Sequence, residues 1–259
     1  MSAPLADPGI TGIEVQSPCA MIANRSIYDT NIRNSVRYQM REKIFDNYLF
    51  IPIIGLPGAG VTETLDQLEK NGEQTVSIDE LLGTRGMCIQ ALSAEVLPTQ
   101  EEFDSRLVAT FRNLDRDAPV YIGWKPTDVF GVKLPPKLVD NVRRASCVVL
   151  PRKRQERLAR VLNQYATPEL STDTVVEFLS PKVSAEALGE ILAHAKSSDK
   201  EPFPDLLACV IERYFDPEYI DEICRFNGAF VGNIDSATGQ FDGKFLPNLT
   251  REKITSYVI

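Results

Sequence analysis

Short apolar runs and stretches of helical periodicity alternate through the middle of the chain. The runs predict four strands, at 49–54, 75–79, 119–124 and 147–150. They are short and mainly apolar, which is typical of strands buried on both faces of a sheet. Between them, Phe103, Leu107 and Phe111 recur every four residues on one face of a predicted helix over 101–115. This alternation predicts a parallel sheet with helices on both faces.

Beyond Pro151 the pattern changes to one helix after another. Helical spacing of apolar residues predicts five helices, over 152–165, 168–179, 183–196, 203–214 and 217–226. The apolar stretch at 227–235 predicts a late strand, and 251–259 predicts a short helix or tail. We therefore expect this part of the chain to be mainly helical, in contrast to the alternating pattern before it.

The first predicted strand leads into a glycine-rich turn. Gly55 and Gly60 are spaced as in the template Gly-x-x-x-x-Gly-Lys-Ser/Thr of the P-loop, and Thr62 fills its last position. The backbone N–H groups of such a turn surround a phosphate. The alternative is an ordinary glycine-rich turn, but the order of strand, turn and helix favours the P-loop. Our fold prediction is α/β: a P-loop NTPase-like parallel sheet with helices on both faces, plus a C-terminal helical subdomain.

The prediction divides the chain into three parts. Residues 1–47 form an N-terminal arm and helix, 48–165 a P-loop-like α/β domain, and 166–259 a helical C-terminal subdomain with a late strand. One residue conflicts with the first strand of the α/β domain. Pro52 has no N–H to donate to a central ladder, so we expect either a bulge there or a regular strand that begins at Ile53.

Val61 stands where the P-loop template has its lysine. That lysine contacts the β- and γ-phosphates of a nucleotide. Backbone amides and a helix N-terminus can bind an anion without it, whereas phosphoryl transfer loses a mobile positive charge. We therefore predict an anion site at the turn formed by Gly58, Ala59, Gly60, Val61 and Thr62. We expect no ATPase or GTPase activity.

Composition and charge exclude several classes of partner. The chain has 259 residues and a formal net charge of -8 at pH 7, which argues against general attraction to DNA, RNA or anionic membranes. No apolar run approaches the ~20 residues of a membrane span, and the N-terminus lacks a signal-peptide pattern. We expect a cytoplasmic protein with no membrane and no DNA partner, in which any RNA contact depends on a local basic patch.

Cysteine and histidine usage gives no metal or redox motif. The odd set of Cys19, Cys88, Cys147, Cys209 and Cys224 contains no Cys-x-x-Cys pair, which argues against a disulfide framework and a zinc site. His194 is the single histidine, so Ser-His-Asp chemistry is not expected. We predict no metal site, and a diphosphate is the one ligand that the sequence suggests.

Six segments in consistent order carry a family likeness: 55–62, 77–86, 97–107, 119–150, 156–165 and 212–223. Together they resemble the P-loop half of the tRNA 2-selenouridine synthase family. The resemblance implies a transferase that replaces the sulfur of a wobble 2-thiouridine by selenium through a geranylated intermediate, using geranyl diphosphate and selenophosphate. Arg85 and Gly86 match the family, so the resemblance implies that Arg85 reaches an anion at the turn.

The chain departs from the family where that chemistry is expected. Val61 replaces the lysine, Thr84 replaces a histidine, and 123–126 replaces an acidic run. A P-loop enzyme uses an acid after that strand to hold Mg²⁺ or its water, so the replacement argues against bound Mg²⁺. Asp128 is the next acid along the chain.

The family's rhodanese domain is also expected to be absent, because only 48 residues precede the first predicted strand. From Cys19 to Ser26 the chain keeps a rhodanese-like Cys-x5-Arg-Ser spacing without the glycines that expose backbone N–H groups. We therefore interpret Cys19 as an unreactive thiol.

The densest basic cluster begins the helix after the fourth predicted strand and consists of Arg152, Lys153, Arg154, Arg157 and Arg160. In a doubly wound sheet this position lies above the carboxyl ends of the strands, on the same rim as the turn. The cluster either contacts phosphates of tRNA or of a diphosphate, or forms a solvated helix face. On the first interpretation, reversing Arg154 and Arg157 to Glu abolishes RNA binding without lowering thermal stability, since exposed charges contribute little to folding.

Three functions remain open. The first is a degenerate selenouridine-synthase-like protein that retains an anion or tRNA surface and does not hydrolyse nucleotides. The second is an active transferase that handles a prenyl diphosphate or thiolated tRNA without the P-loop lysine. The third is a non-catalytic subunit that acts through a protein partner.

Overall fold

The computed structural model describes residues 43–84, 97–126, 128–129, 132–165, 172–180, 183–196, 202–235 and 240–259. Residues 44–259 form one compact unit. The predicted N-terminal arm and most of the helix after it lie outside the described residues, as do Cys19, Arg85, Gly86 and Cys88. A short 3-10 helix, η1 (Lys43–Phe45), precedes the first strand.

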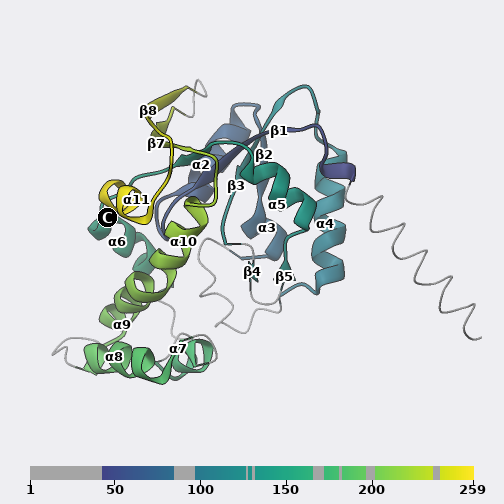
Figure 1. Cartoon of the computed structure of the whole chain (residues 1–259). Coiled ribbons are helices and arrows are strands. Elements are labelled where there is room, and N and C mark those ends of the chain that lie inside the picture. The colour runs from purple at the N-terminus through teal and green to yellow at the C-terminus, as the bar shows by residue number, and fades with distance from the viewer. Residues whose placement is uncertain are drawn as a thin grey trace, which may run out of the picture. The chain divides into compact units, whose positions relative to one another are not determined.

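A six-stranded sheet with the order β2-β3-β1-β6-β7-β8 forms the centre of the unit (Figure 1). Its strands are β1 (Leu49–Ile54), β2 (Gln74–Ser77), β3 (Pro119–Gly123), β6 (Cys147–Val149), β7 (Ala229–Ile234) and β8 (Phe241–Leu246). All neighbours are parallel except β8, which runs antiparallel to β7. Strands β2 and β3 lie on one side of β1, and β6 and β7 lie on its other side. The order of the strands therefore reverses at β1, and ligands of open α/β sheets bind at such a switch point.

Helices cover both faces of this sheet, as predicted. They are α2 (Val61–Lys70), α3 (Ile78–Leu82), α4 (Gln100–Arg112), α5 (Pro136–Arg143), α6 (Arg154–Tyr165), α7 (Thr172–Leu179), α8 (Ala185–Lys196), α9 (Pro202–Val210), α10 (Asp216–Ile223) and α11 (Arg251–Val258). Ile53 and Ile54 are adjacent in β1 and wholly buried, yet they belong to different apolar clusters. The α/β fold class is therefore confirmed, with a largely helical segment following β6.

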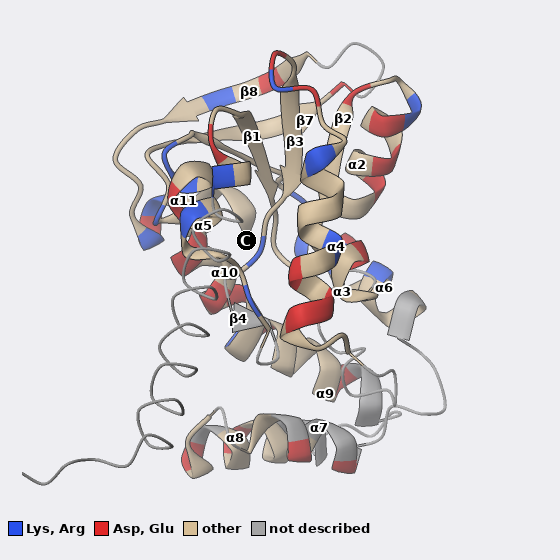
Figure 2. Cartoon of the chain, turned by 90° about the vertical axis from the view of Figure 1, so that its right-hand side faces the viewer, with Lys and Arg blue, Asp and Glu red and all other residues tan. Residues whose placement is uncertain are grey.

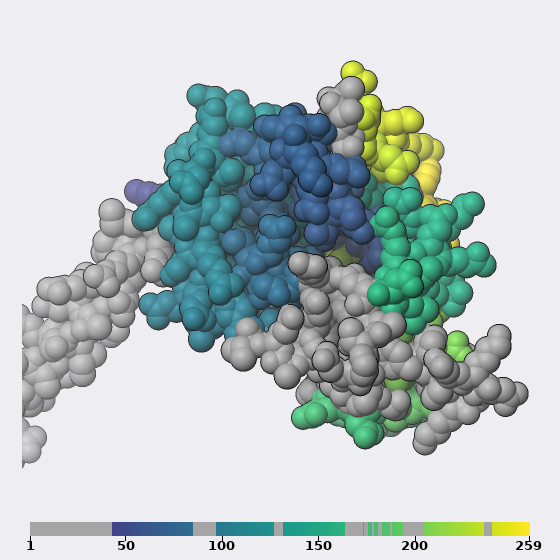
Figure 3. Space-filling model, turned by 180° about the vertical axis from the view of Figure 1, so that it is seen from behind, coloured from purple at the N-terminus to yellow at the C-terminus, as the bar shows by residue number. Residues whose placement is uncertain are grey.

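The two clusters lie on opposite faces because side chains alternate along a strand. One face packs under α2 through Leu65 and Leu68. The other packs under α4, where Phe103 and Phe111 are fully buried. Figure 3 shows α2 in dark blue, with the teal-green α6 to one side of it.

Pro52 neither bulges β1 nor delays its start, so that expectation is wrong. The Ile53 carbonyl accepts a hydrogen bond from the Trp124 N–H at 2.8 Å on the β3 side. Successive residues of a strand direct their backbone groups to opposite sides, so Pro52 faces β6. Pairing with β6 begins only at Ile53, and the missing N–H falls outside that ladder.

The predicted late strand is present, and the helices before it differ from the sequence pattern in one detail. The predicted strand is β7, which pairs with β6 and so returns the chain to the central sheet. The two helices predicted at 203–214 and 217–226 are joined by a π-helical turn, η3 (Ile211–Phe215), which leads directly into α10. Pro217 has no N–H for a regular helical hydrogen bond, and such a π turn accommodates the interruption.

A small antiparallel sheet, separate from the central one, consists of β4 (Asp128–Val129) and β5 (Val132–Lys133). Its register places Asp128 opposite Lys133 and Val129 opposite Val132. Among the described helices, none combines the length and the apolar character that crossing a lipid bilayer requires.

Candidate functional site

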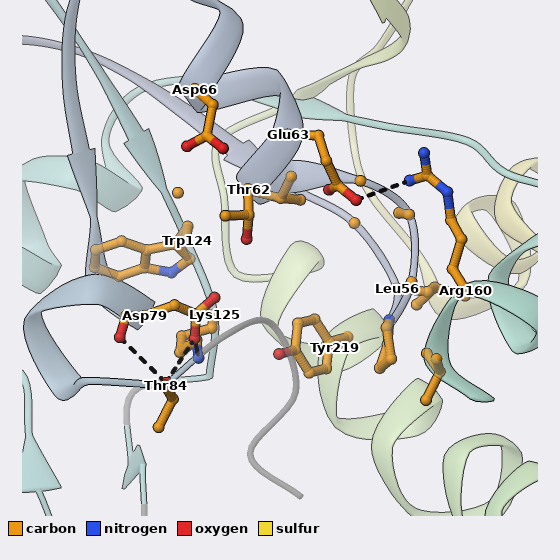
Figure 4. A pocket seen from close by; sticks show the side chains of 18 of the residues that line it. Leu56, Thr62, Glu63, Asp66, Asp79, Thr84, Trp124, Lys125, Arg160 and Tyr219 are labelled. Carbon is orange, nitrogen blue, oxygen red and sulfur yellow. Dashed lines mark hydrogen bonds and ion pairs between the residues drawn. The ribbon is translucent and has the colours of Figure 1, made fainter. Parts of the chain in front are cut away.

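A pocket of about 800 Å³ lies at the carboxyl ends of β1 and β3 (Figure 4). The turn after β1 supplies one wall, and α3, the end of β3, α6 and α10 supply the others. Its polar and aromatic lining includes Thr62, Glu63, Asp66, Asp79, Glu80, Thr84, Trp124, Lys125, Arg160 and Tyr219. The five turn residues predicted to bind an anion, 58–62, all line this pocket.

Gly58 and Gly60 give the turn its shape. Their φ angles of 80° and 99° lie in the left-handed region, which disfavours a residue with a side chain. At Gly58 the backbone of α6 also approaches closely, because a Cβ atom there would lie 2.5 Å from the Arg157 carbonyl oxygen. The turn therefore needs glycine at this position for two separate reasons.

Helix α2 begins at the end of this turn. Gly60 is its N-cap and contributes no side-chain hydrogen bond. The N–H groups of the first helical turn have no acceptor within the helix. Together with the helix dipole, they make this end of α2 favourable for an anion without a lysine at position 61.

Arg160 of α6 lies over the turn. A Cβ atom on Gly60 would come within 2.5 Å of its Nη1 atom, which shows how closely the guanidinium approaches. The same group forms an exposed ion pair with Glu63, at 3.5 Å between Nη1 and Oε1. Arg160 can therefore contact an anion at the turn at the expense of a weak surface pair.

Lys125, on the other side of the pocket, is a residue that was not among the predicted site residues. It follows β3, is 3 % exposed and pairs with Asp79 of α3. Figure 4 shows Asp79, Thr84 and Lys125 together, with Arg160 across the pocket. The sequence signal for Lys125 is a lysine directly after a buried strand, within the segment 123–126 that lacks the family's acids.

The electrostatics of Lys125 combine two opposing influences. Complete burial lowers the pKa of its ammonium group to about 7. The Asp79 carboxylate favours the charged form, and Thr84 orients it by donating from Oγ1 to Asp79 Oδ1 at 3.2 Å. Burial therefore brings proton loss from Lys125 toward neutral pH, while the ion pair with Asp79 opposes that loss.

Trp124 forms a fixed aromatic wall beside Lys125. Its indole Nε1–H donates to Glu222 Oε1 at 2.8 Å. Glu222 is buried and also accepts from Arg143 Nη2 at 2.7 Å. Because these bonds anchor the ring from behind, the wall keeps its position with or without a ligand.

Four acids also line the pocket, so its charge is mixed. Glu63 and Asp66 come from α2, and Asp79 and Glu80 from α3. Burial raises the pKa of Glu80, and the nearby Asp66 and Glu69 raise it further. Within the described ranges, no group of three or more His, Cys, Asp or Glu side chains is arranged to hold a metal ion.

The basic cluster is not the exposed patch that we expected. Arg157 is 1 % exposed and forms a bidentate pair with Asp216, with N–O distances of 3.0 and 2.7 Å. Its Nη1 also donates to the Pro57 carbonyl at 3.1 Å. The prediction that reversing Arg157 leaves stability unchanged is therefore wrong, because α6 buries this side chain between the turn and α10.

The other arginines of the cluster are paired with acids. Arg152 lies 3.7 Å from Glu156, Arg154 pairs with Glu212 and Arg160 pairs with Glu63, while Lys153 is exposed. Glu63, Asp66 and Glu69 add an acidic row along α2 (Figure 2). The local field is close to neutral, which disfavours a polyanion relative to a small ligand.

The described thiols lie outside this chemistry. Cys147, Cys209 and Cys224 are free, and burial raises the pKa of each. They are therefore protonated at neutral pH and are poor nucleophiles.

The chain matches no model of a known protein family, and no curated protein is significantly similar to it in sequence. The resemblance to tRNA 2-selenouridine synthase therefore stays a prediction from the six segments.

Proposed function

We propose that this protein binds a small diphosphate-bearing ligand in the pocket and does not hydrolyse nucleotides. The observation that carries the proposal is the meeting of two features in one pocket. The turn 58–62 presents the N-terminus of α2, and Lys125 enters from β3. Lys125 thus supplies a cation to a P-loop-like turn that lacks its own.

The charges allow one favourable place for the anion. A phosphate at the start of α2 lies between Arg160 on the rim and Lys125 on the opposite wall. A phosphate deeper along α2 meets Asp66 and Glu80 and is repelled. The ligand therefore places its phosphates at the turn and its remaining part across the pocket.

The apolar lining favours a prenyl diphosphate over a nucleotide. Leu56, Val161, Trp124 and Tyr219 are buried residues that line the pocket beside the turn. Removing the hydrocarbon of a prenyl chain from water beside them contributes about 25 cal/mol per Å² of the ligand's own apolar surface. Geranyl diphosphate, which the family resemblance implies, has the required combination of charge and hydrocarbon.

Phosphoryl transfer is not supported by the residue types present. Val61 supplies no charge to the γ-phosphate, and Lys125 stands near the strand end where P-loop enzymes have an acid. The proposed role is thus that of a degenerate, binding-competent relative of the selenouridine synthases in the cytoplasm.

Calorimetric titration with pyrophosphate, geranyl diphosphate and Mg-ATP tests the proposal. We expect geranyl diphosphate to bind more tightly than pyrophosphate, and Mg-ATP to bind poorly. Lys125→Met removes one charged partner, so both diphosphates lose about tenfold or more in affinity. Arg154→Met is the matched control, because Arg154 pairs with Glu212 and does not line the pocket.

Three results would overturn this assignment. Neither diphosphate binds, Lys125→Met binds as tightly as the wild type, or Mg-ATP binds in the low-micromolar range. If bulk tRNA binds at low salt and Arg154→Met weakens that binding, the basic cluster is an RNA surface instead.

A further inference from the structure

Strand β8 forms one edge of the central sheet among the described strands. It is the outermost strand on the β7 side, and no other described strand pairs with its far edge. Residues 242–245 of β8 are all exposed. An open strand edge presents backbone N–H and C=O groups that can pair with another strand.

The register with β7 determines which residues of β8 direct their amides outward. The Asp235 N–H donates to the Gln240 carbonyl at 2.8 Å, and the same register continues as far as Ala229 and Leu246. Hydrogen-bonded and non-hydrogen-bonded pairs alternate in an antiparallel ladder. Phe241, Gly243 and Phe245 therefore face the open edge with their N–H and C=O groups.

A close backbone approach supports this assignment. A Cβ atom built on Gly232 would lie 2.1 Å from the Asp242 carbonyl oxygen, so that carbonyl points toward β7. The neighbouring residues then point away from β7. Three alternate outward positions are thus available for pairing.

Aromatic side chains lie on one face of this edge. The Phe230 ring is 5.4 Å from Phe241 and 4.8 Å from Phe245, measured between centroids. Phe230 is 36 % exposed and Phe245 46 % exposed. Exposed apolar side chains that gather at an open edge are typical of an interaction surface.

The sequence of β8 is complementary in charge and size to a second copy of itself that runs in the opposite direction. Residues 241–245 read Phe-Asp-Gly-Lys-Phe. In an antiparallel pair centred on Gly243, Asp242 lies opposite Lys244 of a second copy, and Lys244 lies opposite Asp242. Phe241 lies opposite Phe245 in the same way, so both charge and shape match.

We infer that β8 pairs antiparallel with β8 of a second copy about Gly243, which makes one continuous sheet across a symmetric dimer. The outward amides of 241, 243 and 245 then form the hydrogen-bonded pairs. Asp242 and Lys244 occupy the non-hydrogen-bonded pairs, in which side chains lie closer together. The two-fold axis closes the assembly at two copies.

The charges favour this occupant over an unrelated strand. A lysine at a strand edge ordinarily protects against pairing. Here Lys244 finds Asp242 of the other copy opposite it, on both sides of the axis. Lys244 also donates to the Tyr257 hydroxyl at 3.0 Å in the same chain, so its side chain is held on the α11 side of the strand.

A charge-swap experiment tests the inference by sedimentation and light scattering over a range of concentrations. The wild type is expected to be a dimer that dissociates on dilution. Asp242→Lys places lysines opposite lysines and Lys244→Asp places acids opposite acids, so each raises the dissociation constant at least about tenfold. The double variant Asp242→Lys/Lys244→Asp restores opposite charges and is expected to dimerise like the wild type.

The double variant separates pairing from structural damage. It also lacks the Lys244–Tyr257 contact, so its recovery cannot come from that bond. Thermal unfolding of all variants checks that the exposed substitutions leave the fold intact. The inference fails if the wild type is monomeric at every concentration, if the single variants dimerise normally, or if the double variant does not recover.

Discussion

Two arginines in one helix have opposite roles in this protein. Arg154 is exposed and pairs with Glu212 on the surface, whereas Arg157 is buried with Asp216. A sequence of charged residues looks uniform, and periodicity alone does not reveal which member faces the interior. The contact of Arg157 with the Pro57 carbonyl makes it part of the turn's support.

This contrast predicts unequal effects on stability. Arg157→Met leaves the buried Asp216 without its partner, so the free energy of unfolding is expected to fall by about 3–5 kcal/mol. Arg154→Met is expected to cost less than about 1 kcal/mol, because exposed pairs contribute little. Urea denaturation of both variants measures the difference, and equal losses would contradict the structural role of Arg157.

Lys125 predicts a pH dependence of ligand binding. Its pKa is lowered to about 7, so the side chain is charged below that pH and increasingly neutral above it. Because only the charged form attracts a phosphate, pyrophosphate affinity is expected to fall as the pH rises through 7. Lys125→Arg keeps its charge, and its affinity is expected to fall less over the same range.

Titrations of both proteins between about pH 6 and pH 8.5 bracket this change. They distinguish the ionisation of the Lys125 side chain from the ionisation of the ligand. Ionisation of pyrophosphate affects the wild type and the variant equally. Parallel pH profiles would therefore contradict a titrating Lys125 at the site.

The turn between β1 and α2 is constrained at Gly58 both by its backbone conformation and by a neighbouring helix. Gly58 and Gly72 have similar φ angles of 80° and 87°, but only Gly58 is crowded by a neighbouring backbone. A Cβ atom on Gly72 would meet nothing within 4 Å. Substitution of Gly72 therefore measures the cost of the left-handed conformation alone, whereas substitution of Gly58 adds the cost of a steric clash.

Gly72→Ala is expected to cost about 1–2 kcal/mol through the left-handed conformation alone. Gly58→Ala adds a clash with α6, typically about 1–3 kcal/mol more, and also distorts the anion site. Chemical denaturation and pyrophosphate titration measure both effects. Equal losses of stability, or a Gly58→Ala protein that binds normally, would contradict the assigned geometry.

Apolar runs predicted β1, β3 and β6 well, because these strands are buried on both faces and allow few polar residues. The edge strand β8 was not predicted, since most of its side chains face solvent and its pattern is weak. Lys125 was missed and Arg157 was misjudged for a related reason. Their roles depend on partners, Asp79 and Asp216, that are distant in sequence and adjacent only in the fold.

On the scale of the whole molecule, the net negative charge and the local charges of the pocket act differently on anionic ligands. The net charge of -8 opposes general binding of polyanions. The pocket lining carries four acids against Lys125 and Arg160, so only the start of α2, between these two cations, favours an anion. The protein can therefore select a compact anion while it disfavours a long one.

The hydrogen bond from Arg157 to the Pro57 carbonyl has a kinetic consequence. Both partners of this bond belong to the chain itself, so the turn is held in shape before an anion arrives. Little conformational entropy is then lost on binding, and no slow ordering step limits association. Variants of the pocket are accordingly expected to change how long a ligand stays rather than how quickly it arrives.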